Sequence, residues 1–336
     1  MIRNRFWRFA AQPHGNDFSA ALALEDEPVP TPGEGEVLIR ADWLSMDAGT
    51  RMWMTPRTDG YQPPLEPGVK MMGLCLGRVV ASRAGGFKTG DLVRGFGQWA
   101  DYSLVRPELS DLRVLDETVT DPRQHFGVLG MNGWTAYVGV LETGAAKAGD
   151  TVLVSAAAGA TGLLACQVAK IAGCRVIGLA GGPEKCRVLV EAFGVDQALD
   201  YKSADVEAEL AKAAGGVNVY FDNVGGPLLD AVLPNMAHYG RIALCGLIAG
   251  YAESGPARGP ARFDQILMRR LTISGFFSPD FSARGDQINA VMRPWMEQGA
   301  IKMAFDETVG LENLLAAYAK LFSGGNIGKV IVDLRG

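Results

Sequence analysis

The sequence contains few of the residues that build metal sites and disulfide frameworks. Among 336 residues there are three histidines and five cysteines. No two cysteines form a C-x-x-C pair, and no histidine lies near a cysteine or glutamate at metal-ligand spacing. An odd number of unpaired cysteines is typical of neither a disulfide scaffold nor a zinc ribbon. We therefore expect no structural or catalytic metal and a reducing compartment.

The sequence also lacks an excess of positive charge and a long uninterrupted apolar run. Its formal net charge is −5, and no stripe of Lys and Arg is present, which argues against a nucleic-acid partner. Residues 152–180 are apolar, but Lys170, Arg175 and several glycines interrupt them, which favours buried parallel strands over a membrane span. Arginines and aromatic residues alternate near the N-terminus, so we read no export signal there. The expected location is cytoplasmic, without a membrane partner.

A strand, a turn of small residues and a helix follow one another in the middle of the chain. The apolar run Val152–Ser155 leads into Ala156–Gly162 and then into the helical stretch Leu163–Ala172. The usual dinucleotide pattern is G-x-G-x-x-G, and Ala157 replaces its first glycine. Small residues let backbone N–H groups and the helix N-terminus approach a pyrophosphate. A second apolar run, Arg175–Ala180, follows at βαβ spacing, so the pattern predicts nucleotide binding rather than a plain buried corner.

The end of the second strand indicates which dinucleotide binds. NAD-preferring enzymes normally place an Asp or Glu there to bind the adenosine ribose. This chain has Gly181, Gly182 and Pro183 instead, with Lys185 shortly after, so we expect no carboxylate at that place. A charge-assisted bond from Lys185 to a 2′-phosphate would stabilise binding by about 1.5–3 kcal/mol, which favours NADP roughly ten- to a hundredfold. The alternative for Lys185 is a solvated lysine in a first helical turn.

The arrangement of apolar runs predicts two kinds of architecture. The first third is β-rich, with strands expected at Glu36–Ala41, Leu76–Ala81 and Trp99–Val105. From about residue 122, strands and helices alternate, which predicts an α/β fold with a doubly wound parallel sheet of the Rossmann type. The expected strands are Thr151–Ser155, Arg175–Ala180, Gln197–Asp200, Val217–Asp222, Gly240–Gly246 and Leu271–Phe276. A helix is expected near Gly285–Gln298, and a final strand within residues 324–332 could return to the first domain.

Several stretches together resemble one protein family over nearly the whole chain. They are Phe87–Val93 with Gly95-Phe96, Leu129–Met131 with Thr135–Tyr137, Ala156–Gly162, Glu184-Lys185, Asp200–Lys202, Phe221–Gly226, Gly275-Phe276 and Asn326–Lys329. The chain is similar to zinc-independent members of the medium-chain dehydrogenase/reductase superfamily, in the branch of leukotriene B4 dehydrogenase/prostaglandin reductase and the alkenal double-bond reductases. Zinc-dependent relatives carry Gly-His-Glu near the position of Gly73-Leu74-Cys75, which is absent here.

The resemblance implies an organisation and a set of site residues. It implies a GroES-like β-rich domain at 1–121, completed by 304–336, a Rossmann NADP-binding domain at 122–303, NADP(H) as cofactor and a homodimer. It places the pyrophosphate on Gly159, Ala160, Thr161 and Gly162, and the 2′-phosphate near Lys185 and Tyr201. The residues implied to line the ribose and nicotinamide are Asn223, Cys245, Gly246, Leu247, Tyr251, Phe276, Phe277, Ser278 and Asn326.

Two departures from the family pattern bear on the substrate. Relatives often carry Pro-Tyr after the Asp of a Ser-x-Asp segment, where this chain has Ala48-Gly49. They commonly carry a tyrosine at the position of Met268. Both changes remove phenol contacts to a substrate carbonyl, so prostaglandin or leukotriene specificity is not expected to transfer. The acceptor depends on the loops at 44–70 and 247–265. A wall of apolar side chains could line it or could be ordinary core: Met46, Met52, Trp53, Met54 and Trp134.

These observations predict an NADPH-dependent reductase of α,β-unsaturated aldehydes and ketones, with an apolar enal or enone as small-molecule partner. Hydride would reach the β-carbon and a proton the α-carbon. Tyr251 is the candidate donor to the substrate oxygen, with packing as its alternative. Cys245 lacks a histidine partner, so packing is favoured over nucleophilic catalysis. An NADPH:quinone oxidoreductase and an NADPH-binding regulatory protein without efficient turnover remain as alternative functions.

Overall fold

The computed structural model describes residues 2–57, 62–212, 215–253, 255 and 257–335. The chain forms two compact units. The β-rich unit comprises Met1–His125, Ala252–Gly255 and Phe305–Gly336, and the α/β unit comprises Phe126–Tyr251 and Pro256–Ala304. The domain limits expected from the sequence, 1–121 with 304–336 and 122–303, stay a prediction. Two loops, 44–70 and 247–265, are expected to shape the substrate site. Positions 58–61 of the first loop and positions 254 and 256 of the second lie outside the described residues.

Within the described residues, the α/β unit contains a six-stranded sheet in the order β10-β9-β8-β11-β12-β13. The strands are β8 (Thr151–Val154), β9 (Arg175–Ala180), β10 (Gln197–Asp200), β11 (Val217–Asp222), β12 (Met236–Leu244) and β13 (Thr272–Gly275). Every pairing along this order is parallel. The chain runs outward from β8 to β10, then resumes at β11 on the other side of β8. The strand order therefore switches between β8 and β11, where ligands bind at the carboxyl ends of such sheets.

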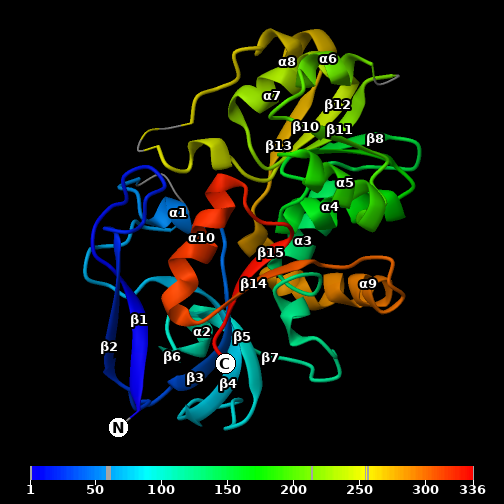
Figure 1. Ribbon diagram of the computed structural model, residues 1–336. Coiled ribbons are helices and arrows are strands. Elements are labelled where there is room, and N and C mark those ends of the chain that lie inside the picture. The colour runs from blue at the N-terminus through cyan, green and yellow to red at the C-terminus, as the bar shows by residue number, and fades with distance from the viewer. Residues whose placement is uncertain (1, 58–61, 213–214, 254, 256, 336) are drawn as a thin grey trace. The chain divides into compact units, whose positions relative to one another are not determined.

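Helices cover both faces of this sheet. They are α3 (Met131–Tyr137), α4 (Ala160–Ile171), α5 (Pro183–Phe193), α6 (Val206–Ala211), α7 (Gly226–Val232), α8 (Asp264–Arg269) and α9 (Gly285–Glu297). Figure 1 shows α4 and α5 on one side of the strands and α6, α7 and α8 on the other. With both faces covered, all four residues of β8 are buried, as its continuous apolar sequence predicts. The Rossmann-type part of the expected fold class is confirmed.

Two elements of the α/β unit begin three or more residues earlier than predicted. The helix after the small-residue turn begins at Ala160, three residues before the expected Leu163, because the turn closes at Gly159. Strand β12 begins at Met236 rather than at Gly240. His238 and Tyr239 in its first half are exposed, and its pairing with β11 changes register between Val217 and Val219. The apolar run that marks a buried strand is therefore interrupted there, although the backbone is extended.

The β-rich unit contains a seven-stranded sheet and a two-stranded hairpin within the described residues. The hairpin pairs β1 (Arg3–Phe9) with β2 (Leu22–Pro28). The larger sheet contains β3 (Val37–Ser45), β4 (Met72–Ser82), β5 (Leu92–Gln98), β6 (Tyr102–Val105), β7 (Arg113–Val114), β14 (Phe305–Val309) and β15 (Lys329–Asp333). Its helices are α1 (Thr50–Trp53), α2 (Pro107–Ser110) and α10 (Leu314–Ser323). Strand β15 pairs with β3, so the final strand does return to the first unit.

One expected strand of the β-rich unit is corrected. Trp99–Val105 was expected as a single strand, but β6 begins at Tyr102. The Trp99 backbone N–H donates to the Met71 carbonyl, and its side chain is fully buried in the core of the unit. Tertiary packing of the indole therefore decides the conformation of this segment, whose sequence alternates as a strand would.

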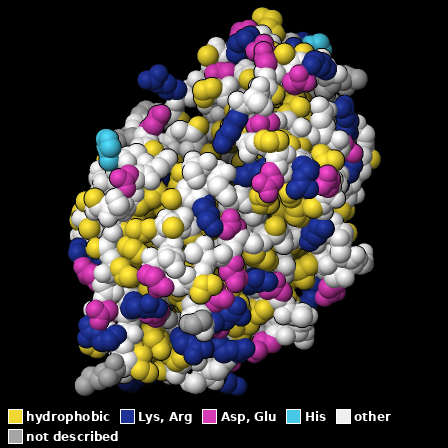
Figure 2. All heavy atoms as spheres, in the orientation of Figure 1, with side chains coloured by type: hydrophobic (Ala, Val, Ile, Leu, Met, Phe, Trp, Pro, Cys, Tyr) yellow, Lys and Arg dark blue, Asp and Glu magenta, His cyan; other side chains and the backbone are white. Residues whose placement is uncertain are grey.

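The surface carries charges of both signs. On the face shown in Figure 2, Lys and Arg side chains are interspersed with Asp and Glu. Many of them pair, such as Arg187 with Glu191 at 2.7 Å and Lys170 with Asp196 at 2.7 Å. Among the described residues, no helix is long and apolar enough to cross a membrane.

Candidate active site

The turn between β8 and α4 has the geometry of a phosphate cradle. Gly159 is the N-cap of α4, and no side chain caps it. The first N–H groups of the helix therefore face the space that an anion would take, where the helix dipole favours negative charge. Ala156 adopts φ +47°, a left-handed conformation that costs a residue with a Cβ roughly 1–2 kcal/mol. The turn accepts this strain at the point where the chain bends from strand to helix.

Gly162 has a structural reason to be glycine. A Cβ at this position would lie 2.3 Å from the Ala156 carbonyl oxygen and 2.9 Å from the Ala157 Cα. The helix consequently packs directly on the turn. Thr161 is held from the other side, since the Asn132 Nδ2 donates to its Oγ1 at 2.9 Å. The predicted pyrophosphate segment is thus the tightly packed start of α4, with Gly159 as its N-cap and Ala160–Gly162 in its first turn.

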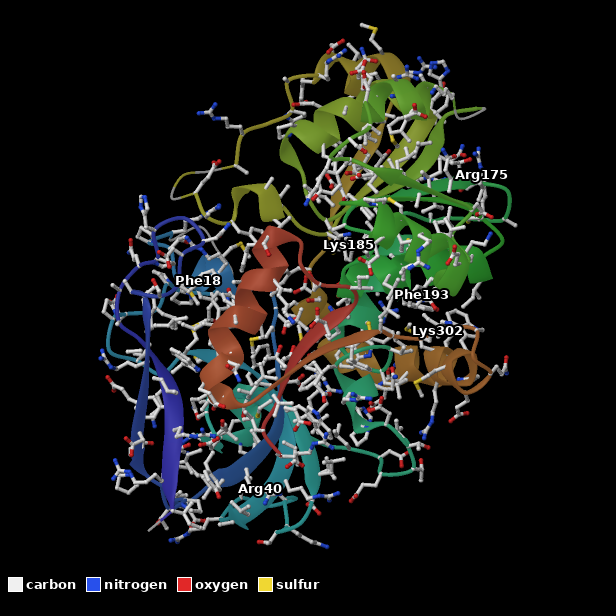
Figure 3. The ribbon with its side chains drawn as sticks, viewed as in Figure 1. Phe18, Arg40, Arg175, Lys185, Phe193 and Lys302 are labelled. Carbon is white, nitrogen blue, oxygen red and sulfur yellow. The ribbon has the colours of Figure 1, made fainter. Side chains whose placement is uncertain are left out.

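The adenosine end of the site differs in one respect from the prediction. Gly181 and Gly182 follow β9 as expected, and Lys185 lies in the first turn of α5 (Figure 3). No carboxylate follows β9 directly, but one from the next strand along the chain lies beside these glycines. Asp200, at the end of β10, accepts a hydrogen bond from the Gly182 N–H at 2.7 Å. Parallel pairing of β10 with β9 places Asp200 opposite Ala180, which sequence distance conceals.

Two side chains cover the first of these glycines. A Cβ on Gly181 would lie 3.0 Å from the Tyr201 hydroxyl and 2.9 Å from the Lys202 Cε. Tyr201 is one of the predicted residues; Lys202 was not among them. The sequence feature that indicates Lys202 is its position directly after Tyr201, in the stretch Asp200–Lys202 that resembles the family. A phenol and an ammonium beside Gly181, together with Lys185 on α5, form a donor set that fits the 2′-phosphate of NADP(H).

The carboxyl end of β11 is organised around one buried carboxylate. The Asp222 Oδ1 accepts from the Ser155 hydroxyl at 2.9 Å, the Tyr220 hydroxyl at 2.8 Å and the Val224 N–H at 2.9 Å. Asn223 then binds back to the end of β8, because its Nδ2 donates to the Ser155 carbonyl at 2.6 Å. Ser155 and Asp222 are thus positioning residues for Asn223. Neither residue stands out in the sequence, because its role depends on the pairing of β8 with β11.

The predicted residues after β12 form a compact loop. The Cys245 N–H donates to the Asp222 carbonyl at 2.8 Å. Burial, and secondly the charge of Asp222, raises the pKa of the Cys245 thiol to about 12. A thiol with this pKa is not a nucleophile at neutral pH, which agrees with the packing interpretation. The Tyr251 hydroxyl accepts from the Leu247 N–H at 3.4 Å and lies close to Gly246.

The loop after β13 contributes aromatic side chains. The Phe276 ring contacts the Phe221 ring edge-on, with 6.0 Å between centroids. Gly139 leaves room for both rings, because a Cβ there would lie within 2.4 Å of each. Phe277 and Ser278 follow at the start of a 3₁₀ helix. Within the α/β unit, the predicted ribose and nicotinamide residues are all partly exposed at the carboxyl ends of β11, β12 and β13.

Asn326 and four of the five side chains expected to form an apolar wall belong to the β-rich unit. Asn326 is buried, and its Nδ2 donates to the Gly328 carbonyl at 2.9 Å. Met46, Trp53 and Met54 belong to the core of this unit, which supports the packing alternative for them, whereas Met52 is partly exposed. In the α/β unit Trp134 is also buried, and its Nε1 donates to the Asn289 side chain at 2.8 Å.

Comparison with known proteins covers almost the entire chain. Residues 5–112 match a family model described as the N-terminal domain of oxidoreductase, and residues 160–293 match one described as zinc-binding dehydrogenase. The NADPH-dependent curcumin reductase of Escherichia coli is 38% identical over 99% of this chain and 98% of that protein. The chain belongs to the zinc-independent branch of the medium-chain dehydrogenase/reductase superfamily that contains the alkenal double-bond reductases.

Two further relatives of this reductase family are informative. The 2-alkenal reductase (NADP(+)-dependent) of Nicotiana tabacum is 37% identical over 89% of this chain and 88% of that protein. The crystal structure of CurA in complex with NADPH from Vibrio vulnificus superposes with a TM-score of 0.91 and 36% identity, covering 99% of each chain. The expected fold class, a Rossmann-type sheet plus a GroES-like β-rich domain, is thereby confirmed. As a member of this family, the protein is an oxidoreductase.

The description of the second family model mentions zinc, which raises the question of whether this reductase has side chains that could bind a metal ion. In the described part of the chain, no three His, Cys, Asp or Glu side chains are grouped so that they could hold a metal ion. At the place of the Gly-His-Glu of zinc-dependent relatives, Cys75 is fully buried in β4, and burial raises the pKa of its thiol to about 12.

Proposed function

We propose that this reductase transfers hydride from NADPH to the β-carbon of α,β-unsaturated aldehydes or ketones. The observation that carries the proposal is the similarity, over nearly the full length, to proteins named as NADPH-dependent curcumin reductase and NADP-dependent 2-alkenal reductase. The structure of the NADPH complex of CurA supports NADP(H) as the cofactor. The donor set around Gly181 supports the same choice, because two lysines and a phenol suit a 2′-phosphate.

Each group of site residues has a role in this proposal. Ala160, Thr161 and Gly162 bind the pyrophosphate through backbone N–H groups, and Gly159, whose own N–H donates to the Ala156 carbonyl at 2.9 Å, is the N-cap beside them. Lys185, Tyr201 and Lys202 bind the 2′-phosphate. Within the α/β unit, the residues that line the ribose and nicotinamide are Asn223, Cys245, Gly246, Leu247, Tyr251, Phe276, Phe277 and Ser278. Bound NADPH supplies the hydride.

Negative charge develops on the substrate oxygen as the β-carbon accepts hydride. A hydrogen-bond donor must stabilise this charge, and a proton must reach the α-carbon. Tyr251 is the proposed donor. Its hydroxyl is anchored at the Gly246–Leu247 backbone at the carboxyl end of β12, which fixes the phenol at the edge of the sheet where ligands bind. Backbone N–H groups of the same loop can share the charge.

Replacing Tyr251 by phenylalanine should lower kcat by about tenfold, the value of one neutral hydrogen bond that strengthens in the transition state. The NADPH KM should change less than about twofold, because no phosphate contact is lost. Steady-state kinetics with trans-2-hexenal measures both constants. Tyr239→Phe, at an exposed tyrosine of β12, is the matched control. An unchanged kcat for Tyr251→Phe would remove the tyrosine from catalysis.

The activity is tested by initial rates of NADPH oxidation with a series of 2-alkenals, an aryl enone and a benzoquinone, and with NADH in parallel. Mass spectrometry should identify the saturated carbonyl product. Turnover of alkenals or enones with NADPH supports the proposal. Turnover of the quinone alone favours a quinone oxidoreductase, and tight NADPH binding without turnover of any acceptor favours a regulatory protein.

We also propose that the enzyme is a homodimer formed through the α/β unit. Strand β13 is an edge strand of the described sheet, and α8, which precedes it in the chain, has no buried residue. Phe263, Leu267 and Met268 are 68%, 72% and 57% exposed, and Ile273 of β13 is also exposed. An apolar, unpaired sheet edge is a surface that proteins usually cover. A second copy of the chain would cover it with the same residues.

Light scattering coupled to size exclusion should give twice the chain mass of 35.8 kDa at micromolar concentration. Leu267→Glu should shift the enzyme toward monomer, because a charge at an apolar contact is costly. Val309→Glu, at an exposed valine of β14, is the control and should leave the mass unchanged. A monomeric wild type would refute this proposal.

A further inference from the structure

Asp200 joins two loops that the chain does not connect directly. Its Oδ1 accepts from the Gly182 N–H at 2.7 Å and from the Lys202 N–H at 3.0 Å. Its Oδ2 accepts from the Ser203 hydroxyl at 2.9 Å. One side chain thus ties the turn after β9 to the turn after β10. The Tyr201 N–H, which donates to the Ala180 carbonyl at 3.1 Å, closes the same junction.

The donors around Asp200 stabilise its ionised carboxylate. The Gly182 N–H, followed by the Lys202 N–H, holds the pKa of Asp200 below its ordinary value. Three protein donors take most of the roughly four acceptor sites of the carboxylate, so its hydrogen bonds serve mainly the junction. This separates Asp200 from the acidic residue at the end of the second strand in NAD-binding folds, whose oxygens face the ribose.

The junction determines where two side chains lie. The backbone of Gly181–Gly182 is held against the backbone of Tyr201–Lys202, and the side chains of the latter pair pass within about 3 Å of a Cβ position on Gly181. Gly182 has φ +99°, so this turn has a conformation that other residues rarely adopt and gains from an external tie. Asp200 supplies two hydrogen bonds at this junction, from the Gly182 and Lys202 N–H groups, and the bond from the Tyr201 N–H to the Ala180 carbonyl adds a third.

We propose that Asp200 is a positioning residue for cofactor selectivity, which holds Tyr201 and Lys202 beside Gly181 so that the enzyme prefers nucleotides with a 2′-phosphate. This inference rests on the proposed NADP(H) site. It assigns opposite effects to the shape and the charge of Asp200. The hydrogen-bonding shape of its side chain holds the donors in place, whereas its negative charge by itself would weaken the binding of a nearby phosphate.

Two substitutions separate these effects. Asp200→Asn keeps an oxygen for the Gly182 and Lys202 N–H groups, and its amide can donate to the Ser203 oxygen. Asp200→Ala removes all three bonds. Asp205→Ala is the matched control, because Asp205 is a nearby loop carboxylate that caps α6 through the Ala208 N–H and makes no bond to the Gly181–Gly182 turn.

The readout is equilibrium binding of two cofactor fragments, 2′,5′-ADP and 5′-AMP, to the full-length protein by isothermal titration calorimetry. We expect Asp200→Ala to weaken 2′,5′-ADP binding by about tenfold and 5′-AMP binding by less than about twofold. Asp200→Asn should bind 2′,5′-ADP at least as tightly as the wild type. Asp205→Ala should behave as the wild type. Thermal unfolding verifies that each variant is folded.

The outcomes distinguish this inference from the proposed function. If the wild type does not prefer 2′,5′-ADP over 5′-AMP, the NADP(H) site is wrong and the inference fails with it. If the wild type shows the preference but Asp200→Ala retains it, the role of Asp200 alone is overturned. Equal loss in Asp200→Asn and Asp200→Ala would also overturn it, because a shape role predicts rescue by asparagine.

Discussion

The Lys185→Glu variant should raise the NADPH KM by about a hundredfold, because a charge-assisted bond to the 2′-phosphate is lost and a like charge replaces it. Lys185 lies in the first turn of α5, directly after Gly181 and Gly182. NADH carries no 2′-phosphate, so its KM should change less than about threefold. The ratio of kcat/KM for the two cofactors, measured with one alkenal at saturation, is the quantity to compare.

Arg187→Glu provides the matched control for this change. Arg187 lies two residues further along the same helix, is exposed, and pairs with Glu191 at 2.7 Å. The substitution alters the net charge by the same amount and removes only a surface pair, which contributes little to stability. Its cofactor ratio should stay near the wild-type value. An NADPH KM that is unchanged in Lys185→Glu would show that this lysine does not contact the cofactor.

The second large effect is expected at Gly162. A methyl group there would lie 2.3 Å from the Ala156 carbonyl oxygen, far inside a van der Waals contact. Because the obstructing atom belongs to the backbone, the turn itself must move, and the pyrophosphate donors move with it. Gly162→Ala should therefore weaken NADPH binding by at least about a hundredfold, since displaced phosphate contacts cost several kcal/mol in total. Quenching of the protein fluorescence by NADPH measures the dissociation constant.

Gly159→Ala is the control in the same turn. Its Cβ would lie 3.2 Å from the same carbonyl oxygen, and its φ of −81° is accessible to alanine. NADPH binding should weaken by less than about fivefold, because a shift of a few tenths of an ångström relieves the contact. Circular dichroism and the thermal midpoint separate loss of binding from loss of the fold. Wild-type affinity in a folded Gly162→Ala variant would contradict the assigned cradle.

The local features of this protein were predictable because they depend on short stretches of chain. The apolar run that ends in Ser155, the small-residue turn and the apolar stretch after it specify strand, turn and helix in order. The same holds for β9, β10 and β11, whose limits follow from apolar runs bounded by glycine and charged residues. The structure departs from the predicted strands in two kinds of segment. In one, side chains of an extended segment are exposed, as at His238 and Tyr239; in the other, one large side chain is buried in the core, as with Trp99.

The sequence by itself determined the order of strands and helices, the small-residue turn, the place of Lys185 after two glycines and the family resemblance, because each depends on residues close together in the chain. The tertiary structure decided which distant residues meet. Pairing of β10 with β9 brings Asp200 to Gly182, and pairing of β11 with β8 brings Asp222 to Ser155. Antiparallel pairing of β15 with β3 likewise places the Lys329 ammonium on the Met46 carbonyl. Strand register sets these contacts, and register is a property of the assembled sheet rather than of any single segment.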